Sequence, residues 1–148
     1  MRILSADLES NQKTEDNKVA LFIDANSARD FQTILKAYES AQSYGRVVYA
    51  SLYAEEKDLT LIGTMSNELS KKGIDIKVAI GPNEISIALD AMEFAYERKA
   101  DCIVICTRRE SLVPVFKEIK KLDVKTVLLS PMSIPTGLSD IADETHIL

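Results

Sequence analysis

The stretch VALFIDANSARDF, residues 19–31, places a continuous apolar run directly before a polar segment. Five consecutive apolar residues, VALFI, are typical of a strand that is buried on both faces of a parallel sheet. The run stops at Asp24, and Ser27 and Asp30 have the spacing of a capping box that begins a helix. This stretch therefore predicts the strand-to-helix unit of an α/β fold, with an acid at the carboxyl end of the strand.

The same unit recurs along the rest of the chain. Further apolar or alternating runs predict four more strands, RVVYASLYA (46–54), IDIKVAI (74–80), CIVIC (102–106) and KTVLLS (125–130). Apolar residues at helical spacing predict four helices, with the stripes Phe31, Ile34, Leu35 and Tyr38; Leu59, Ile62, Met65 and Leu69; Ile85, Leu89, Met92 and Tyr96; and Leu112, Val115, Phe116, Ile119 and Leu122. This alternation predicts a three-layer α/β sandwich around a mostly parallel, five-stranded sheet.

The two ends of the chain differ from this pattern. Residues 1–17 are mainly polar and predict a loose lead-in, so the 148 residues indicate one domain that covers 18–148. The closing LSDIADETHIL predicts a short helix followed by an extended segment.

Charge and apolar content exclude several classes of protein. The net charge of −5 argues against a broad basic surface for duplex DNA. No apolar run approaches the ~20 residues that cross a bilayer, and the first residues lack the apolar core of a signal peptide. These features predict a cytoplasmic protein that does not bind membranes. Cys102 and Cys106 lie too far apart along one strand for a disulfide and are interpreted as core thiols.

Polar residues gather at the predicted carboxyl ends of the strands, where ligands bind in open parallel sheets. The segments concerned are Asp24–Ser27, Gly81–Glu84, Thr107–Ser111 and the residues after Ser130. The first of them contains no glycine, which argues against a dinucleotide or P-loop phosphate site. Candidate ligand-binding residues in these loops are Asn26, Ser27, Arg108, Arg109, Glu110 and Ser111.

Four stretches together resemble the NYN domain family, which is related to the PIN nucleases. They are VALFIDANSARDF, NEISIALDAMEFAY, CIVICTRRESLVPVFKEIKKL and the closing LSDIADETHIL, and they cover residues 18–148. The resemblance implies a sheet of order 3-2-1-4-5 whose carboxylates hold Mg²⁺ or Mn²⁺ and cleave RNA. Hard divalent cations prefer carboxylate oxygens, and such a metal activates water and stabilises phosphoryl oxygens.

The resemblance assigns catalytic positions to three acids of this chain. Asp24 falls on the first family aspartate, Glu84 on the acid that opens the third helix, and Asp90 on a later aspartate of that helix. Asp24 and Glu84 would be the metal ligands of an active enzyme. Asp90 is six residues from Glu84, which is about 120° around the helix and roughly 9 Å along it, so it is the weaker candidate for direct ligation.

The fourth strand departs from the family pattern. The two aspartates of the family's SDSDF segment fall on Arg109 and Ser111, with Glu110 between them. The exchange shifts the local charge by about three units toward positive, and Coulomb repulsion then opposes a divalent cation. An arginine beside a helix start also makes a good phosphate site. A solvated loop remains the simpler interpretation of the two arginines.

Three functions follow as hypotheses. The first is a degenerate NYN domain that binds RNA or a nucleotide with little or no cleavage. The second is an active ribonuclease dependent on Mg²⁺ or Mn²⁺, and the third is a non-catalytic regulatory or oligomeric module. Under the first hypothesis, the degenerate NYN domain, we expect Arg109 to take the place of a metal and to bridge Asp24 or Glu84. We expect the Arg108 side chain to point the opposite way.

Overall fold

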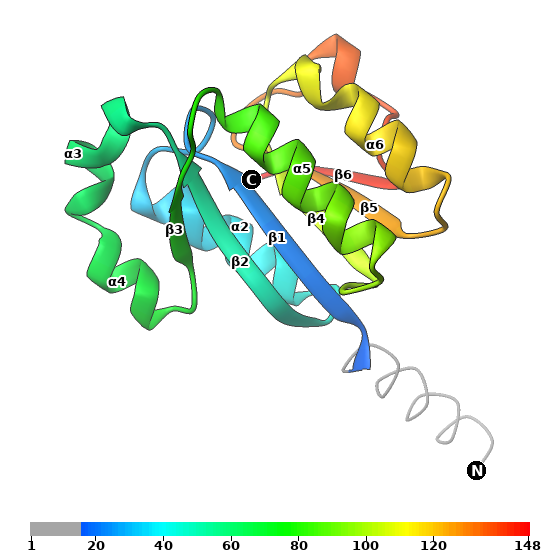
Figure 1. The fold of residues 1–148 in the computed structure, drawn as a ribbon, viewed down its shortest axis with the longest axis horizontal. Helices are drawn as coiled ribbons and strands as arrows, with labels where there is room; N and C mark the ends of the chain where they lie inside the picture. Colours follow the sequence, from blue (N-terminus) through cyan, green and yellow to red (C-terminus); the bar gives the residue numbers. More distant parts are fainter. Residues whose placement is uncertain (1–15) are drawn as a thin grey trace.

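The computed structural model describes residues 16–148 as a parallel sheet between two layers of helices (Figure 1). Six strands lie in the order β3-β2-β1-β4-β5-β6, and every neighbouring pair is parallel. The strands are β1 (Lys18–Asp24), β2 (Arg46–Ala54), β3 (Asp75–Val78), β4 (Cys102–Cys106), β5 (Lys125–Ser130) and β6 (Glu144–Ile147). β1 and β4 are neighbours, as expected, so their carboxyl ends form the switch point of the sheet.

Helices connect the strands on both faces. The α-helices are α2 (Phe31–Gln42), α3 (Leu59–Gly63), α4 (Ser66–Lys71), α5 (Asn83–Tyr96) and α6 (Val113–Lys120), and the 3-10 turns are η1 (Glu56–Asp58), η2 (Glu110–Leu112) and η3 (Thr136–Leu138). The helix expected around Leu59 and Leu69 is thus two short helices after a turn. The predicted lead-in, residues 1–17, lies outside the described residues except for its last two positions.

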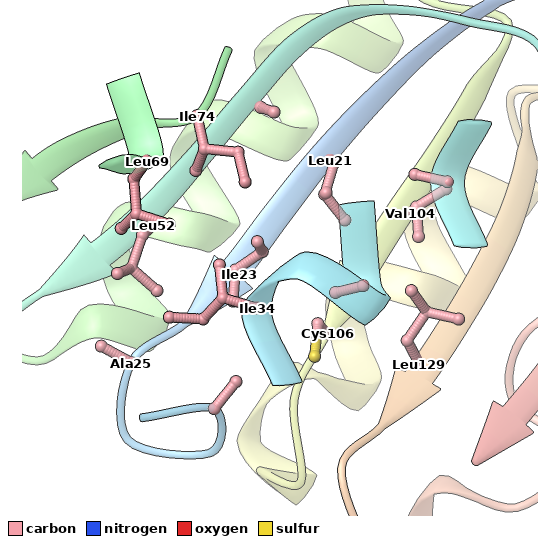
Figure 2. Close-up of a cluster of buried hydrophobic side chains, with 14 of the residues drawn as sticks. Leu21, Ile23, Ala25, Ile34, Leu52, Leu69, Ile74, Val104, Cys106 and Leu129 are labelled. Carbon is pink, nitrogen blue, oxygen red and sulfur yellow. The ribbon is translucent and has the colours of Figure 1, made fainter. Parts of the chain in front are cut away.

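Alternate residues of the central strands fill two separate cores. Val19, Leu21 and Ile23 of β1 point toward α2, α3 and α4, where Ile34, Ile62 and Leu69 are buried. Figure 2 shows part of this core, with Cys106 among the apolar side chains. Ala20 and Phe22 point the other way, toward α5 and α6. The continuous apolar runs of the sequence arise from this burial on both faces.

The expectation of five strands was wrong by one. The predicted terminal extended segment pairs with β5 as the parallel edge strand β6, in register from Val127 opposite Glu144 to Ser130 opposite Ile147. Lys125 Nζ lies 2.6 Å from Glu144 Oε2, and the Asp143 carboxylate accepts a hydrogen bond from Thr126 N. Such contacts between residues far apart in the sequence cannot be predicted from the local pattern of a four-residue strand.

The pH dependence of stability provides a test of the β6 attachment. The hydrogen bond from Lys125 holds the pKa of Glu144 below its usual 4.5. A depressed folded-state pKa stabilises the fold above the unfolded pKa, and this contribution is lost as the pH falls through the folded value. We therefore expect the melting-temperature advantage of the wild type over Glu144→Gln to shrink below about pH 4.5. Added salt should also reduce it, because the pair is partly exposed.

Thermal unfolding of both proteins across the acidic range measures this effect. Glu118→Gln is the control, because Glu118 forms an exposed pair with Lys121 on α6, away from β6. A melting-temperature difference between wild type and Glu144→Gln that stays constant with pH would contradict the assigned contact.

Two local predictions of the sequence were also wrong. Asp30, not Ser27, is the N-cap of α2, and its carboxylate accepts from Thr33 N at 3.0 Å. On α5, the expected core stripe is largely exposed, and the small residues Ala91 and Ala95 cover the sheet instead. The rings of Phe22, Tyr49 and Phe94 pack against one another on this face in tilted or edge-on contacts, with centroids 4.7–5.6 Å apart. These aromatic rings fill the space beside the sheet.

Candidate functional site

Asp24 is the centre of the candidate site and is completely buried at the end of β1. Its Oδ1 accepts hydrogen bonds from Asn26 N at 3.0 Å and from Asn83 Nδ2 at 3.3 Å. Its Oδ2 accepts from Ser27 Oγ at 3.2 Å and from Thr107 Oγ1 at 3.1 Å. A buried carboxylate is costly unless it is hydrogen-bonded. These four donors come from the loop after β1, the loop after β4 and the first residue of α5.

Two hydroxyl groups link Asp24 to the loop that follows β4. Ser27 Oγ accepts from Arg108 N at 3.0 Å, and Thr107 Oγ1 accepts from Arg109 N at 3.0 Å. Each hydroxyl therefore donates to the carboxylate and accepts from the backbone of an arginine. The buried acid fixes the position of the β4–α6 loop through these contacts.

Arg109 lies between the two acids at this edge of the sheet, as the sequence predicted. Its Nε is 3.4 Å from Asp24 Oδ2. Its Nη1 donates to Glu84 Oε1 at 3.4 Å and lies 3.3 Å from Glu84 Oε2 in an ion-pair contact. The arginine side chain is 37% exposed, so one end contacts the acids and the other reaches solvent. Its charge partly compensates both carboxylates.

Arg108 points away from this cluster, also as expected. Its Nε donates to Ser133 O at 3.1 Å, in the segment after β5. Glu110 faces the same side of the molecule and accepts from Gly137 N at 3.1 Å. Ser111 is exposed within η2, one turn before α6. The loop after β4 therefore directs its charged side chains to two different places.

Asp90 belongs to a separate cluster on α5. Its Oδ2 accepts from Tyr53 Oη at 2.6 Å and contacts Lys77 Nζ. Tyr53 in turn shares a hydrogen bond with Tyr49, and burial raises the pKa of Tyr53 far above its usual range. The structure thus brings Asp24 and Glu84 together, while Asp90 contacts residues of β2 and β3.

The sequence analysis included Thr107 and Asn83 in the expected segments but did not single them out as members of the site. Both are fully buried and both donate to Asp24. Their positions after β4 and at the start of α5 were a usable signal, because both lie at carboxyl ends of strands or just beyond. Three buried polar atoms here have no hydrogen-bond partner within residues 16–148, namely Asn26 Nδ2, Asn83 Oδ1 and Glu84 Oε2.

The donor set does not fit a divalent cation as it stands. A carboxylate offers about four lone-pair sites, and protein donors already occupy the sites of Asp24. In the part of the chain that the structure describes, no three His, Cys, Asp or Glu side chains are grouped to hold a metal. Arg109 adds a positive charge where the two acids meet.

Residues 18–148 match the model of the NYN domain. The chain belongs to the NYN family. Its two central features, a parallel sheet with β1 beside β4 and an aspartate at the end of β1, are those that the resemblance implied.

Two further proteins extend this comparison. An uncharacterised protein of Methanocaldococcus jannaschii is 25% identical over 143 residues, which are 91% of this chain and 57% of that protein. The chain thus spans little more than half of the length of this curated relative. The crystal structure of a protein of unknown function from Vibrio parahaemolyticus superposes on this chain with a TM-score of 0.73 at 18% sequence identity. The match covers 89% of this chain and 93% of the Vibrio chain. That similarity shows the fold.

None of the helices within residues 16–148 is both long and apolar enough to cross a membrane.

Proposed function

We propose that this NYN domain binds the phosphate groups of RNA or a nucleotide through Arg109, with little or no cleavage. One observation carries the proposal: the Arg109 guanidinium lies between Asp24 and Glu84. The resemblance to the family places an aspartate at the position of Arg109. A divalent cation would have to displace this guanidinium and compete with the four donors that surround Asp24. Both requirements oppose metal-dependent hydrolysis.

Arg109 also has unused capacity for an anion. A guanidinium carries five N–H donors, and the contacts with the acids occupy Nε and Nη1. Within residues 16–148, Nη2 makes no hydrogen bond or ion pair. Because the side chain is partly exposed, a phosphate can approach it without opening the fold. The guanidinium geometry suits two oxygens of one phosphate.

The proposal predicts binding that depends on Arg109 and requires no metal. In the presence of EDTA, we expect short single-stranded RNA to bind at least about tenfold more weakly to Arg109→Gln than to wild type. That factor corresponds to about 1.4 kcal/mol, within the range of hydrogen bonds to charged groups. Fluorescence anisotropy with labelled RNA, and competition by a nucleoside monophosphate, measure the loss.

Arg108→Gln is the matched control, because it removes the same charge from a side chain that contacts Ser133 O instead of the acids. Circular dichroism establishes that both variants are folded. Equal affinities of Arg109→Gln and Arg108→Gln for RNA would mean that general charge, not the site, drives binding. Equal RNA affinities of the wild type and both variants would mean that neither arginine contributes to binding and that both belong to a solvated loop.

A further inference from the structure

Residues 108–121, which contain the loop after β4 and helix α6, carry a charge opposite to that of the whole chain. The basic residues of this segment are Arg108, Arg109, Lys117, Lys120 and Lys121, and its acids are Glu110 and Glu118. Five positive and two negative charges leave the segment with a net charge of +3, whereas the whole chain carries −5. A local excess of positive charge on an acidic chain indicates a surface for a negatively charged ligand.

The lysines of α6 lie on its outer surface, beside α5 in the same layer (Figure 1). The inner side of the helix is buried through Val115, Phe116 and Ile119. Exposed positions follow one another every three residues and form what we call the α6 ridge, which consists of Ser111, Pro114, Lys117 and Lys120. At 1.5 Å per residue, its two lysines lie roughly 12–16 Å along the chain from Arg109. The ridge therefore continues outward from the candidate site.

Both lysines of the ridge are available to a ligand. Within residues 16–148, neither Lys117 nor Lys120 forms an ion pair, and the exposed Asp123 beyond the helix does not pair with Lys120. Of the two acids in the segment, Glu118 pairs with Lys121 at 2.9 Å, and Glu110 accepts a hydrogen bond from the backbone of η3. The ridge itself contains no acid, so its positive charge faces solvent.

We infer that the α6 ridge binds the phosphate backbone of a single-stranded RNA, one phosphate of which lies at Arg109. This inference rests on the proposed function and specifies its ligand as a strand of several nucleotides, because a single nucleotide bound at Arg109 leaves both ridge lysines unused. Lysines bind backbone phosphates without regard to sequence. The ridge is one helix wide and carries no aromatic ring on which a base could stack, so we expect binding with little sequence preference.

The salt dependence of RNA binding tests the ridge. Each phosphate of a single strand that the protein neutralises contributes about 0.7 to the slope of log affinity against log salt concentration. Lys117→Gln combined with Lys120→Gln should therefore reduce the size of this slope by about 1.4 relative to the wild type. Fluorescence anisotropy measures the slope with a labelled RNA of about eight nucleotides, in EDTA and over a series of KCl concentrations.

Lys36→Gln combined with Lys72→Gln is the matched control. It also removes two exposed lysines that form no ion pair within residues 16–148, but these lie on α2 and at the end of α4, on the other face of the sheet. The control should keep the slope of the wild type, and circular dichroism establishes that both double variants are folded.

Three results would overturn the inference. The first is an equal slope for the ridge variant and the control, and if Arg109→Gln still weakens RNA binding in that case, the proposed function stands without the ridge. The second is an RNA that binds the wild type no more tightly than a nucleoside monophosphate does. The third is a reduced slope in the ridge variant with no effect of Arg109→Gln, which would place RNA on α6 without the candidate site and would contradict the proposed function as well.

Discussion

Replacement of Asp24 by alanine is expected to lower the free energy of unfolding by about 3–5 kcal/mol, the usual cost of breaking a buried charge pair. The carboxylate is fully buried and receives four hydrogen bonds and one ion pair. Its removal leaves Asn83 Nδ2 and the hydroxyls of Ser27 and Thr107 without their acceptor. Each buried donor that loses its partner adds a desolvation cost.

Urea unfolding of Asp24→Ala measures this loss, and Asp30→Ala provides the comparison. Asp30 is six positions away and caps α2 at an exposed position, where an alanine typically costs about 1 kcal/mol. Asp24→Asn should fall between the two, because it keeps one acceptor oxygen and the shape of the side chain. If Asp24→Ala were no less stable than Asp30→Ala, the carboxylate would not organise these loops.

The second large effect concerns metal affinity. Arg109→Asp combined with Ser111→Asp introduces acids at the two positions where the family resemblance implies them, and it changes the local charge by about three units. We expect Mn²⁺ to bind this variant at least about tenfold more tightly than it binds the wild type, and phosphate to bind more weakly. Isothermal titration calorimetry with each ligand measures both changes.

The control for this variant is Arg108→Asp combined with Ser139→Asp. It makes the same change of charge away from Asp24. The Arg108 side chain contacts the segment after β5, and Ser139 lies within that segment. Both double variants should remain folded, since all four positions are at least partly exposed. Equal Mn²⁺ affinities of the two variants would show that overall charge, not the position between the acids, governs metal binding.

The α/β class of the fold and the pairing of Asp24 with Arg109 were predictable from the sequence, whereas the sixth strand was not. Two runs, VALFI and CIVIC, mark strands that are buried on both faces, and the acid and the arginine follow their carboxyl ends. Parallel strands bring such loops to one edge, so a charge pair between them follows from topology. The family resemblance supplied the strand order that makes β1 and β4 neighbours.

Other features were set by contacts that a local pattern does not record. β6 is attached through Lys125 and Asp143, and the sequence showed only an extended tail. On α5, the large apolar side chain of Leu89 led to its prediction as a core residue. In the structure Leu89 is exposed, and the small Ala91 is buried against the sheet instead. Glu110 also packs closely against Gly137. A Cβ atom added at Gly137 would come 2.7 Å from the carboxyl carbon of Glu110.

The central claim is that Arg109 replaces the metal of an NYN site, so that binding survives without cleavage. The most direct test is a cleavage assay on a panel of single-stranded RNAs with Mn²⁺ or Mg²⁺, comparing wild type with Asp24→Asn and Glu84→Gln. The wild type is predicted to show no more metal-dependent cleavage than either variant. Clear Mn²⁺-dependent cleavage by the wild type that both substitutions abolish would contradict the account and identify an active ribonuclease.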